Sequence, residues 1–186
     1  DCAGLETSWT FTYNIFHVTP PHQVLPFVPT SGPDVECVDD VAPPAILPEV
    51  RDVCGVLLSP TMSSPVLGGT YTGCEGTYTY TYNYVDCAGL PFSWTYTINI
   101  NHVTEPAEVN GPVSTFGGIV ECVSEVSPPT ILPEVRDVCG ALLLPSEDSP
   151  VIGGTYQTCD GTYTYTYHYE DCSGLDYYWT YAYTIE

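Results

Sequence analysis

The chain has 186 residues, of which 23 are acidic and two are basic, and its formal net charge is −21. This charge excludes a nucleic-acid-binding protein and argues against binding to anionic membranes, because phosphate contacts need lysine and arginine. Hydrophobic residues make up 44% of the chain, too many for intrinsic disorder. No stretch is long and apolar enough to predict insertion into a membrane.

A repeat with a fixed period organises the chain. Cys2, Cys87 and Cys172 are spaced 85 residues apart, and the same offset relates the remaining cysteines to one another. This length suits a small β-domain rather than one turn of a solenoid. We therefore predict the last strand of a preceding repeat at 1–16, repeat 1 at 17–101 and repeat 2 at 102–186. The leading strand indicates either an excerpt from a longer array, which we favour, or a strand donated to a neighbouring molecule.

The first half of each repeat is rich in proline. HVTPP (17–21) and HVTEP (102–106) open the two repeats, and VAPPAILPEV (41–50) follows in repeat 1. Proline forbids a helix and a central position in a sheet, so we expect extended edge segments here. His17 and His102 occupy the same repeat position at the predicted boundary, where packing between repeats is their expected role.

The second half of each repeat alternates strictly. Residues 76–90 read GTYTYTYNYVDCAGL, and a second alternating run, WTYTINI, starts at Trp94. A two-residue period predicts strands, and the short glycine-containing turn between them predicts an antiparallel hairpin. One face of each hairpin should form a core, and the residues expected there are Tyr78, Tyr80, Tyr82, Trp94, Tyr163, Tyr165, Tyr167 and Trp179. The fold class predicted is all-β without helix, as tandem immunoglobulin-like sandwiches of about seven short strands each.

The cysteines point to an oxidising compartment. Each repeat has four, and the absence of a C-x-x-C pair disfavours zinc. In an immunoglobulin-like strand order, Cys37 and Cys74 lie at one end of the sandwich, and Cys54 and Cys87 lie at the opposite end. We therefore predict the disulfides Cys37–Cys74, Cys54–Cys87, Cys122–Cys159 and Cys139–Cys172, each closing a loop of about 35 residues. The partner of Cys2 is expected outside the chain.

Recurring acidic residues flank the cysteines. Asp52, Asp86, Asp137 and Asp171 adjoin the loop cysteines, and Glu36 and Glu121 precede Cys37 and Cys122. Calcium takes six to eight oxygen ligands, so these four aspartates are the candidate calcium ligands. No D-x-D-x-D-G loop is present, and the alternative is that Asp52 and Asp86 cap turns or pair with Arg51. No other cofactor is expected.

The motifs D-x-C-G, C-x-G-T-Y-T-Y-T-Y, D-C-A-G-L and W-T-Y-T-I resemble the four-cysteine relatives of the hyalin-repeat (HYR) immunoglobulin-like domain. Such repeats are similar to those of very large cell-surface adhesins of Bacteroidota, including gliding-motility adhesins. The resemblance implies an extracellular protein displayed on the cell surface, and it supplies no catalytic residue.

These features predict a non-enzymatic repeat of an extracellular filament or adhesin stalk, giving reach and rigidity for adhesion or gliding. Its expected partners are neighbouring identical repeats, and surface glycans are a further candidate. Two alternatives stay open. One is an array of carbohydrate-binding modules, which would need the same aromatic cluster exposed in both repeats. The other is a self-polymerising fibre subunit that donates residues 1–16 as a strand.

Overall fold

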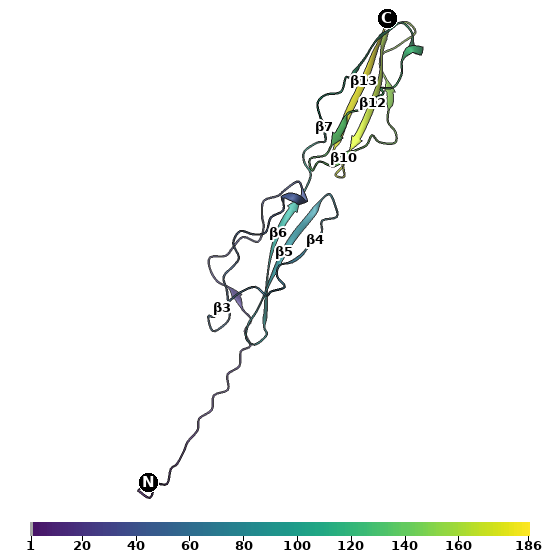
Figure 1. Cartoon of the computed structure of the whole chain (residues 1–186). Coiled ribbons are helices and arrows are strands. Elements are labelled where there is room, and N and C mark those ends of the chain that lie inside the picture. Colours follow the sequence, from purple (N-terminus) through teal and green to yellow (C-terminus); the bar gives the residue numbers. More distant parts are fainter. Residues whose placement is uncertain (1) are drawn as a thin grey trace.

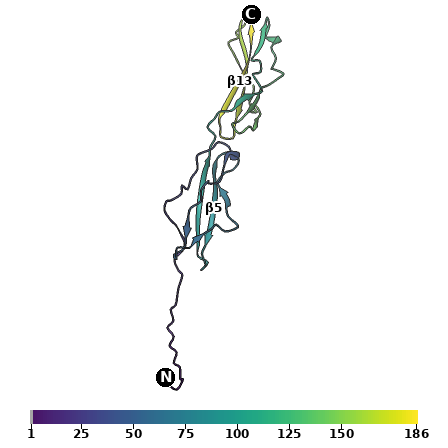
Figure 2. The ribbon, with the colours of Figure 1, turned by 60° about the vertical axis from the view of Figure 1, so that its left-hand side comes forward.

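The computed structural model describes residues 2–186. Two elongated β-units lie end to end, and an extended N-terminal segment leaves the first unit on the side away from the second (Figures 1 and 2). The elements of the first unit are β1 (His22–Gln23), η1 (Val38–Asp40), β2 (Val50–Arg51), β3 (Leu57–Leu58), β4 (Val66–Gly69), β5 (Gly76–Val85) and β6 (Pro91–Ile100). Those of the second are β7 (Ala107–Val109), β8 (Phe116–Val120), η2 (Val123–Glu125), β9 (Glu134–Arg136), β10 (Leu142–Leu143), β11 (Val151–Gly153), β12 (Gly161–Glu170) and β13 (Asp176–Ile185).

The predicted tyrosine hairpins are confirmed. β5 pairs with β6 in antiparallel register over ten residue pairs from Gly76↔Ile100 to Val85↔Pro91, and β12 pairs with β13 in the same way. β4 and β11 each add a third strand to these sheets. In the second unit β8 pairs in parallel with β13, whereas the equivalent segment of the first unit makes only the isolated bridges Ser31↔Thr97 and Val35↔Ile100.

A smaller sheet faces each hairpin, with strand order β1-β2-β3 in the first unit and β10-β9-β7 in the second. Val50 on β2 and Val135 on β9 are fully buried against the aromatic face of the larger sheet. The all-β, immunoglobulin-like fold class is thereby confirmed. Within residues 2–186, the helical elements are two 3₁₀ turns of three residues each, η1 and η2.

Each unit has its own hydrophobic core. Of the residues predicted for it, Tyr82, Trp94, Tyr165, Tyr167 and Trp179 are buried, and Tyr78, Tyr80 and Tyr163 are half-buried. The prediction missed the deepest tyrosines, Tyr84 and Tyr169, each 1% exposed. These lie last on the tyrosine face, next to the turn of the hairpin, where the smaller sheet covers them.

Candidate functional site: the joint between the units

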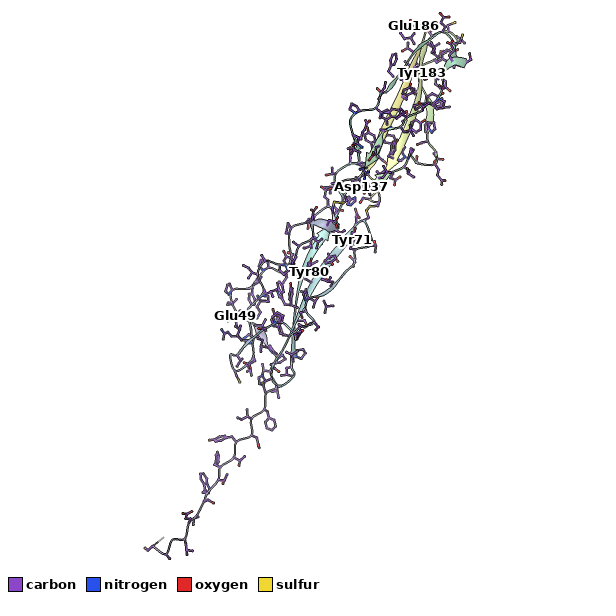
Figure 3. All side chains as sticks on the ribbon, viewed as in Figure 1. Glu49, Tyr71, Tyr80, Asp137, Tyr183 and Glu186 are labelled. Carbon is purple, nitrogen blue, oxygen red and sulfur yellow. A yellow bond between two sulfur atoms is a disulfide. The ribbon has the colours of Figure 1, made fainter. Side chains whose placement is uncertain are left out.

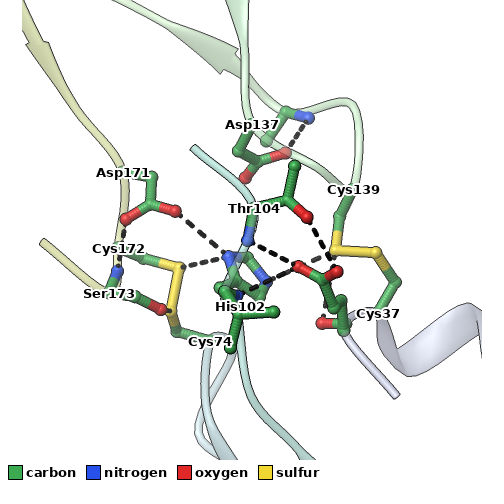
Figure 4. Close-up of a disulfide and its surroundings, with 12 residues drawn as sticks. Cys37, Cys74, His102, Thr104, Asp137, Cys139, Asp171, Cys172 and Ser173 are labelled. Carbon is green, nitrogen blue, oxygen red and sulfur yellow. Dashed lines mark hydrogen bonds and ion pairs between the residues drawn. A yellow bond between two sulfur atoms is a disulfide. The ribbon is translucent and has the colours of Figure 1, made fainter. Parts of the chain in front are cut away.

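Polar side chains and two disulfides gather at the place where the two units meet (Figure 4). His102 lies two residues after the end of β6, and it is 7% exposed. Its Nδ1 lies 3.3 Å from Asp171 Oδ2, and its Nε2 lies 3.3 Å from the sulfur of Cys139. The imidazole therefore fills the space between the units, as expected for a histidine that packs at the boundary.

Two disulfides cross this joint. Cys37 is bonded to Cys139 and Cys74 to Cys172, with Cα–Cα distances of 5.5 and 5.8 Å. One sulfur of each bond belongs to the first unit and the other to the second. The joint is therefore covalently locked at two points, one on each side of His102 (Figure 4).

The predicted disulfide pairing is wrong. Cys37 and Cys74 do share one end of the first unit, and Cys139 and Cys172 share the facing end of the second, as the strand order suggested. However, each sulfur is bonded across the joint rather than to its neighbour on the same end. The bonds Cys37–Cys74 and Cys139–Cys172 are excluded by these partners, and the remaining predicted pairs Cys54–Cys87 and Cys122–Cys159 are not bonded, since all four thiols are free and exposed. Cys2 is also free.

The error has a physical cause. The predicted pairs suit a small sandwich whose own core is too weak to hold it folded, and which therefore needs a disulfide within the repeat. Both cores are instead closed by aromatic packing, with no sulfur among the residues of either core cluster. The bridges span sequence separations of 102 and 98 residues, far longer than the loops expected.

Backbone-to-carboxylate hydrogen bonds also tie the units together. The Glu36 carboxylate accepts from the backbone N–H of Val103 at 3.0 Å and of Thr104 at 2.9 Å, and from the Thr104 hydroxyl at 2.9 Å. These donors lower the pKa of Glu36 because they favour its charged form. The glutamate that precedes Cys37 thus belongs to the same joint as the disulfide.

Aspartates shape the turns that present the cysteines. Asp52 Oδ1 accepts from the backbone N–H of Cys54 at 2.9 Å and of Val56 at 2.8 Å, and Asp86 Oδ1 accepts from Ala88 and Leu90. In the second unit Asp171 Oδ1 accepts from Ser173 and Leu175, and Asp137 Oδ1 accepts from Ala141. Turn capping, the alternative to calcium binding, is therefore observed at all four positions, and a calcium site stays a prediction.

Burial and hydrogen bonding act in opposite directions on Asp171. Its burial raises the pKa, but hydrogen bonds from Leu175, His102 and Ser173 outweigh it, so the pKa lies below its ordinary value. Asp171 therefore stays ionised at neutral pH, facing His102.

The two arginines brace the same turns. Arg51 Nε donates to Glu49 at 2.6 Å, and Arg51 Nη1 donates to the carbonyl of Gly55 at 2.7 Å; Arg136 makes the equivalent bonds with Glu134 and Gly140. Gly55 and Gly140 directly follow Cys54 and Cys139, and their φ angles of 84° and 83° require glycine. Each arginine therefore pairs with the glutamate two residues before it.

A family model described as an HYR-like domain with four cysteines matches residues 28–100 and 115–185, more than half of the chain. The chain belongs to this family. HYR-like repeats are extracellular, adhesion-type repeat domains of a non-catalytic structural kind. No curated protein matches the chain. Among residues 2–186 no helix is long and apolar enough to cross a membrane.

Proposed function

We propose that this pair of HYR-like repeats is a length of an extracellular stalk or filament, displayed on the cell surface, that gives reach and rigidity for adhesion or gliding. The observation that carries the proposal is the joint. Two disulfides and the Glu36 contacts fix successive units end to end, so that they lie in one line (Figure 1). A flexible tether would not need such a joint.

The acidic surface supports the same role. With 23 acidic and two basic residues, neighbouring filaments repel one another and stay apart. The four cysteines of each repeat fit an oxidising compartment, as does the extracellular setting of the family.

An adhesion assay tests this proposal. In cells that produce the protein, residues 17–186 are replaced by a Gly/Ser linker with the same number of residues, which behaves as a flexible coil. Surface labelling with an antibody to a retained segment should stay unchanged, while adhesion or gliding should be lost. Undiminished adhesion with the flexible linker would contradict the proposal.

One observation favours the strand-donating fibre subunit as a second candidate. The side chains of the extended N-terminal segment stand away from the rest of the molecule (Figure 3). Trp9 and Ile15 in this segment are 83% and 91% exposed, whereas their repeat equivalents Trp94 and Ile100 are 4% and 2% exposed. A segment with this side-chain pattern fits as the last strand of another repeat, in the same polypeptide or in a neighbour. Multimers held by such a strand should survive reduction of all disulfides in a gel run without boiling.

One exposed aromatic pair of the second repeat is absent from the first. Tyr178 is 60% exposed and stacks on His168 with ring centroids 4.7 Å apart. The equivalent positions in the first repeat are Ser93 and Asn83, which form a hydrogen bond of 2.7 Å instead. This aromatic pair therefore gives no support to a glycan site common to both repeats.

A further inference from the structure

The four cysteines that form the joint have repeat equivalents at the two outer ends of the molecule, and these equivalents are not bonded. Cys139 and Cys172, on the second unit's side of the joint, have the repeat equivalents Cys54 and Cys87 in the first unit. These lie at the end of the first unit that faces away from the joint, which is called the near end below. The equivalents of Cys37 and Cys74 are Cys122 and Cys159. These lie at the end of the second unit that faces away from the joint, which is called the far end. All four are free and exposed.

We propose that each end of the molecule is half of the same joint and binds a further four-cysteine repeat through two disulfides. This inference rests on the proposed stalk function and names the partner that extends the stalk. A far end that carries the pair Cys122 and Cys159 would bond to a near end that carries Cys54 and Cys87. Because the two halves differ, such contacts run head to tail and do not close on themselves.

The near end of the first unit brings together the same types of residue as the closed joint, although its histidine contacts the aspartate through the other ring nitrogen. His17 Nε2 lies 3.1 Å from Asp86 Oδ2, and His17 Nδ1 lies 3.8 Å from the sulfur of Cys87. In the closed joint the corresponding distances from His102 Nδ1 are 3.3 Å to Asp171 and 3.9 Å to the sulfur of Cys172. The cysteine turns are capped by Asp52 and Asp86, so closing requires no rearrangement of the turns.

This near end also carries an imperfectly bonded buried pair. His17 Nε2 and Asp86 Oδ2 are buried and lie 3.1 Å apart, but their geometry does not form a hydrogen bond. Their counterparts in the closed joint, His102 and Asp171, are hydrogen-bonded at 3.3 Å. A buried polar pair with poor hydrogen-bond geometry is costly, so we expect docking of another repeat to turn the His17 ring until it pairs as His102 does.

The far end of the second unit carries the complementary groups. Cys122 precedes η2 with φ and ψ of −131° and 142°, close to the −117° and 144° of Cys37 before η1. Glu121 stands where Glu36 stands in the closed joint, and at the near end Val18 and Thr19 repeat the donor residues Val103 and Thr104. The contacts that flank the observed disulfides can therefore form again at a new joint.

Closing the joint is an oxidation. Two thiol pairs become two disulfides, and their four protons and four electrons pass to two molecules of oxidised glutathione, each of which is reduced to two thiols. Thiol–disulfide exchange through a mixed disulfide supplies the bond-forming step, with one cysteine of each pair attacking after its partner has been oxidised.

Capped variants test the proposal, with a second copy of this chain as the probe. All chains carry Cys2→Ser, which removes the thiol of the N-terminal segment. Cys54→Ser with Cys87→Ser caps the near end, and Cys122→Ser with Cys159→Ser caps the far end; both leave the observed joint intact. In a buffer of oxidised and reduced glutathione, the uncapped chain should form a ladder of disulfide-linked multimers.

Each capped chain alone should stay monomeric, and an equimolar mixture of the two should stop at the dimer. Mass-spectrometric mapping of that dimer should find Cys54 bonded to Cys122 and Cys87 bonded to Cys159. Glu121→Gln in the near-end-capped chain should slow dimer formation severalfold. A mixture that remains monomeric, multimers of a singly capped chain, or a Cys54–Cys87 bond within one copy would each overturn the inference. None of these results bears on adhesion, so the stalk proposal stands or falls separately.

Discussion

At the residue scale, the cores depend on tyrosines whose hydroxyl groups have been taken out of water. Tyr84 and Tyr169 are each 1% exposed, and their hydroxyl oxygens have no hydrogen-bond partner among residues 2–186. The apolar ring gains from burial, while the hydroxyl loses its hydrogen bonds to water. Burial, together with Tyr167, Tyr177 and Glu108, raises the pKa of Tyr169 to about 12.

Alkaline pH should therefore destabilise the second unit. Below the ordinary tyrosine pKa of 10.0 the residue is neutral in both the folded and the unfolded state. As pH rises from there toward about 12, only the unfolded state ionises, so the free energy of unfolding falls. Denaturant titrations at several alkaline pH values measure this.

Tyr169→Phe should flatten that pH dependence and leave the stability at neutral pH equal or slightly higher, because it removes an unpaired buried hydroxyl. Tyr178→Phe, at a 60% exposed position, is the matched control and should change neither quantity. An unchanged alkaline slope in Tyr169→Phe would count against this assignment.

At the scale of the elements, the third strand of the large sheet in the first unit, β4, ends on a glycine pair that the hairpin requires. Gly69 at the end of β4 has φ of 122°, and a Cβ built on it would lie 2.0 Å from the carbonyl oxygen of Thr77. Gly68 next to it has an ordinary φ, and its added Cβ would meet only the Thr79 hydroxyl at 3.2 Å. The second glycine thus allows the backbone of β4 to turn away against β5.

Gly69→Ala should destabilise the first unit by at least about 2 kcal/mol, because a side chain is strained at this φ and meets backbone atoms. Gly68→Ala, one residue away, should cost clearly less. Urea unfolding midpoints of the two variants measure the difference. Equal midpoints would show that the backbone at Gly69 adapts to a side chain.

At the scale of the whole molecule, the disulfides determine how the units are held to one another rather than whether each unit folds. Both bridges cross the joint, and each core cluster lies within one unit. A bridge that closes a loop of about 100 residues contributes about 4.7 kcal/mol in the chain-entropy estimate. That stabilisation opposes unfolding of both units together.

Cys37→Ser combined with Cys74→Ser should leave the far-ultraviolet circular dichroism of the native protein unchanged. Small-angle X-ray scattering should show a broader distribution of lengths, because the units then bend at the joint. Cys122→Ser with Cys159→Ser is the control, since these thiols are free in the same chain. Loss of β-structure in the joint variant alone would show that the bridges are needed for folding of the units.

The non-covalent part of the joint should weaken in acid. The pKa values of Glu36 and Asp171 are both lowered in the folded protein, so their contributions are present above the ordinary carboxyl pKa. These contributions are lost as pH falls through the lowered values. In the Cys37→Ser, Cys74→Ser background, scattering should therefore show more bent molecules as pH is lowered into that range.

Glu36→Gln should reduce this acid response, and protonation of Asp171 should account for the response that remains. Glu121→Gln, at the equivalent position outside the joint, should leave the response unchanged. Equal responses in both variants would mean that Glu36 does not hold the joint.

The sequence by itself determined the repeat, the paired strands and the face of each hairpin that packs inward. These follow from local spacing: alternation decides which side chains share a face, and the D-C-A-G-L turn fixes the register of the hairpin. Local spacing does not predict how deeply each tyrosine on that face is buried, because Tyr84 and Tyr169 are covered by strands that are distant in the sequence, β2 and β9.

Only the tertiary structure decided the partners of the cysteines. Strand order placed Cys37 with Cys74 at one end of a unit, but a disulfide forms where two Cα atoms come within about 6 Å, and those sulfurs face the next unit rather than each other. Because repeats of identical spacing offer the same cysteines at every offset of 85 residues, no pattern within one repeat distinguishes an internal bond from one across the joint. The distance between two separately folded units makes that distinction.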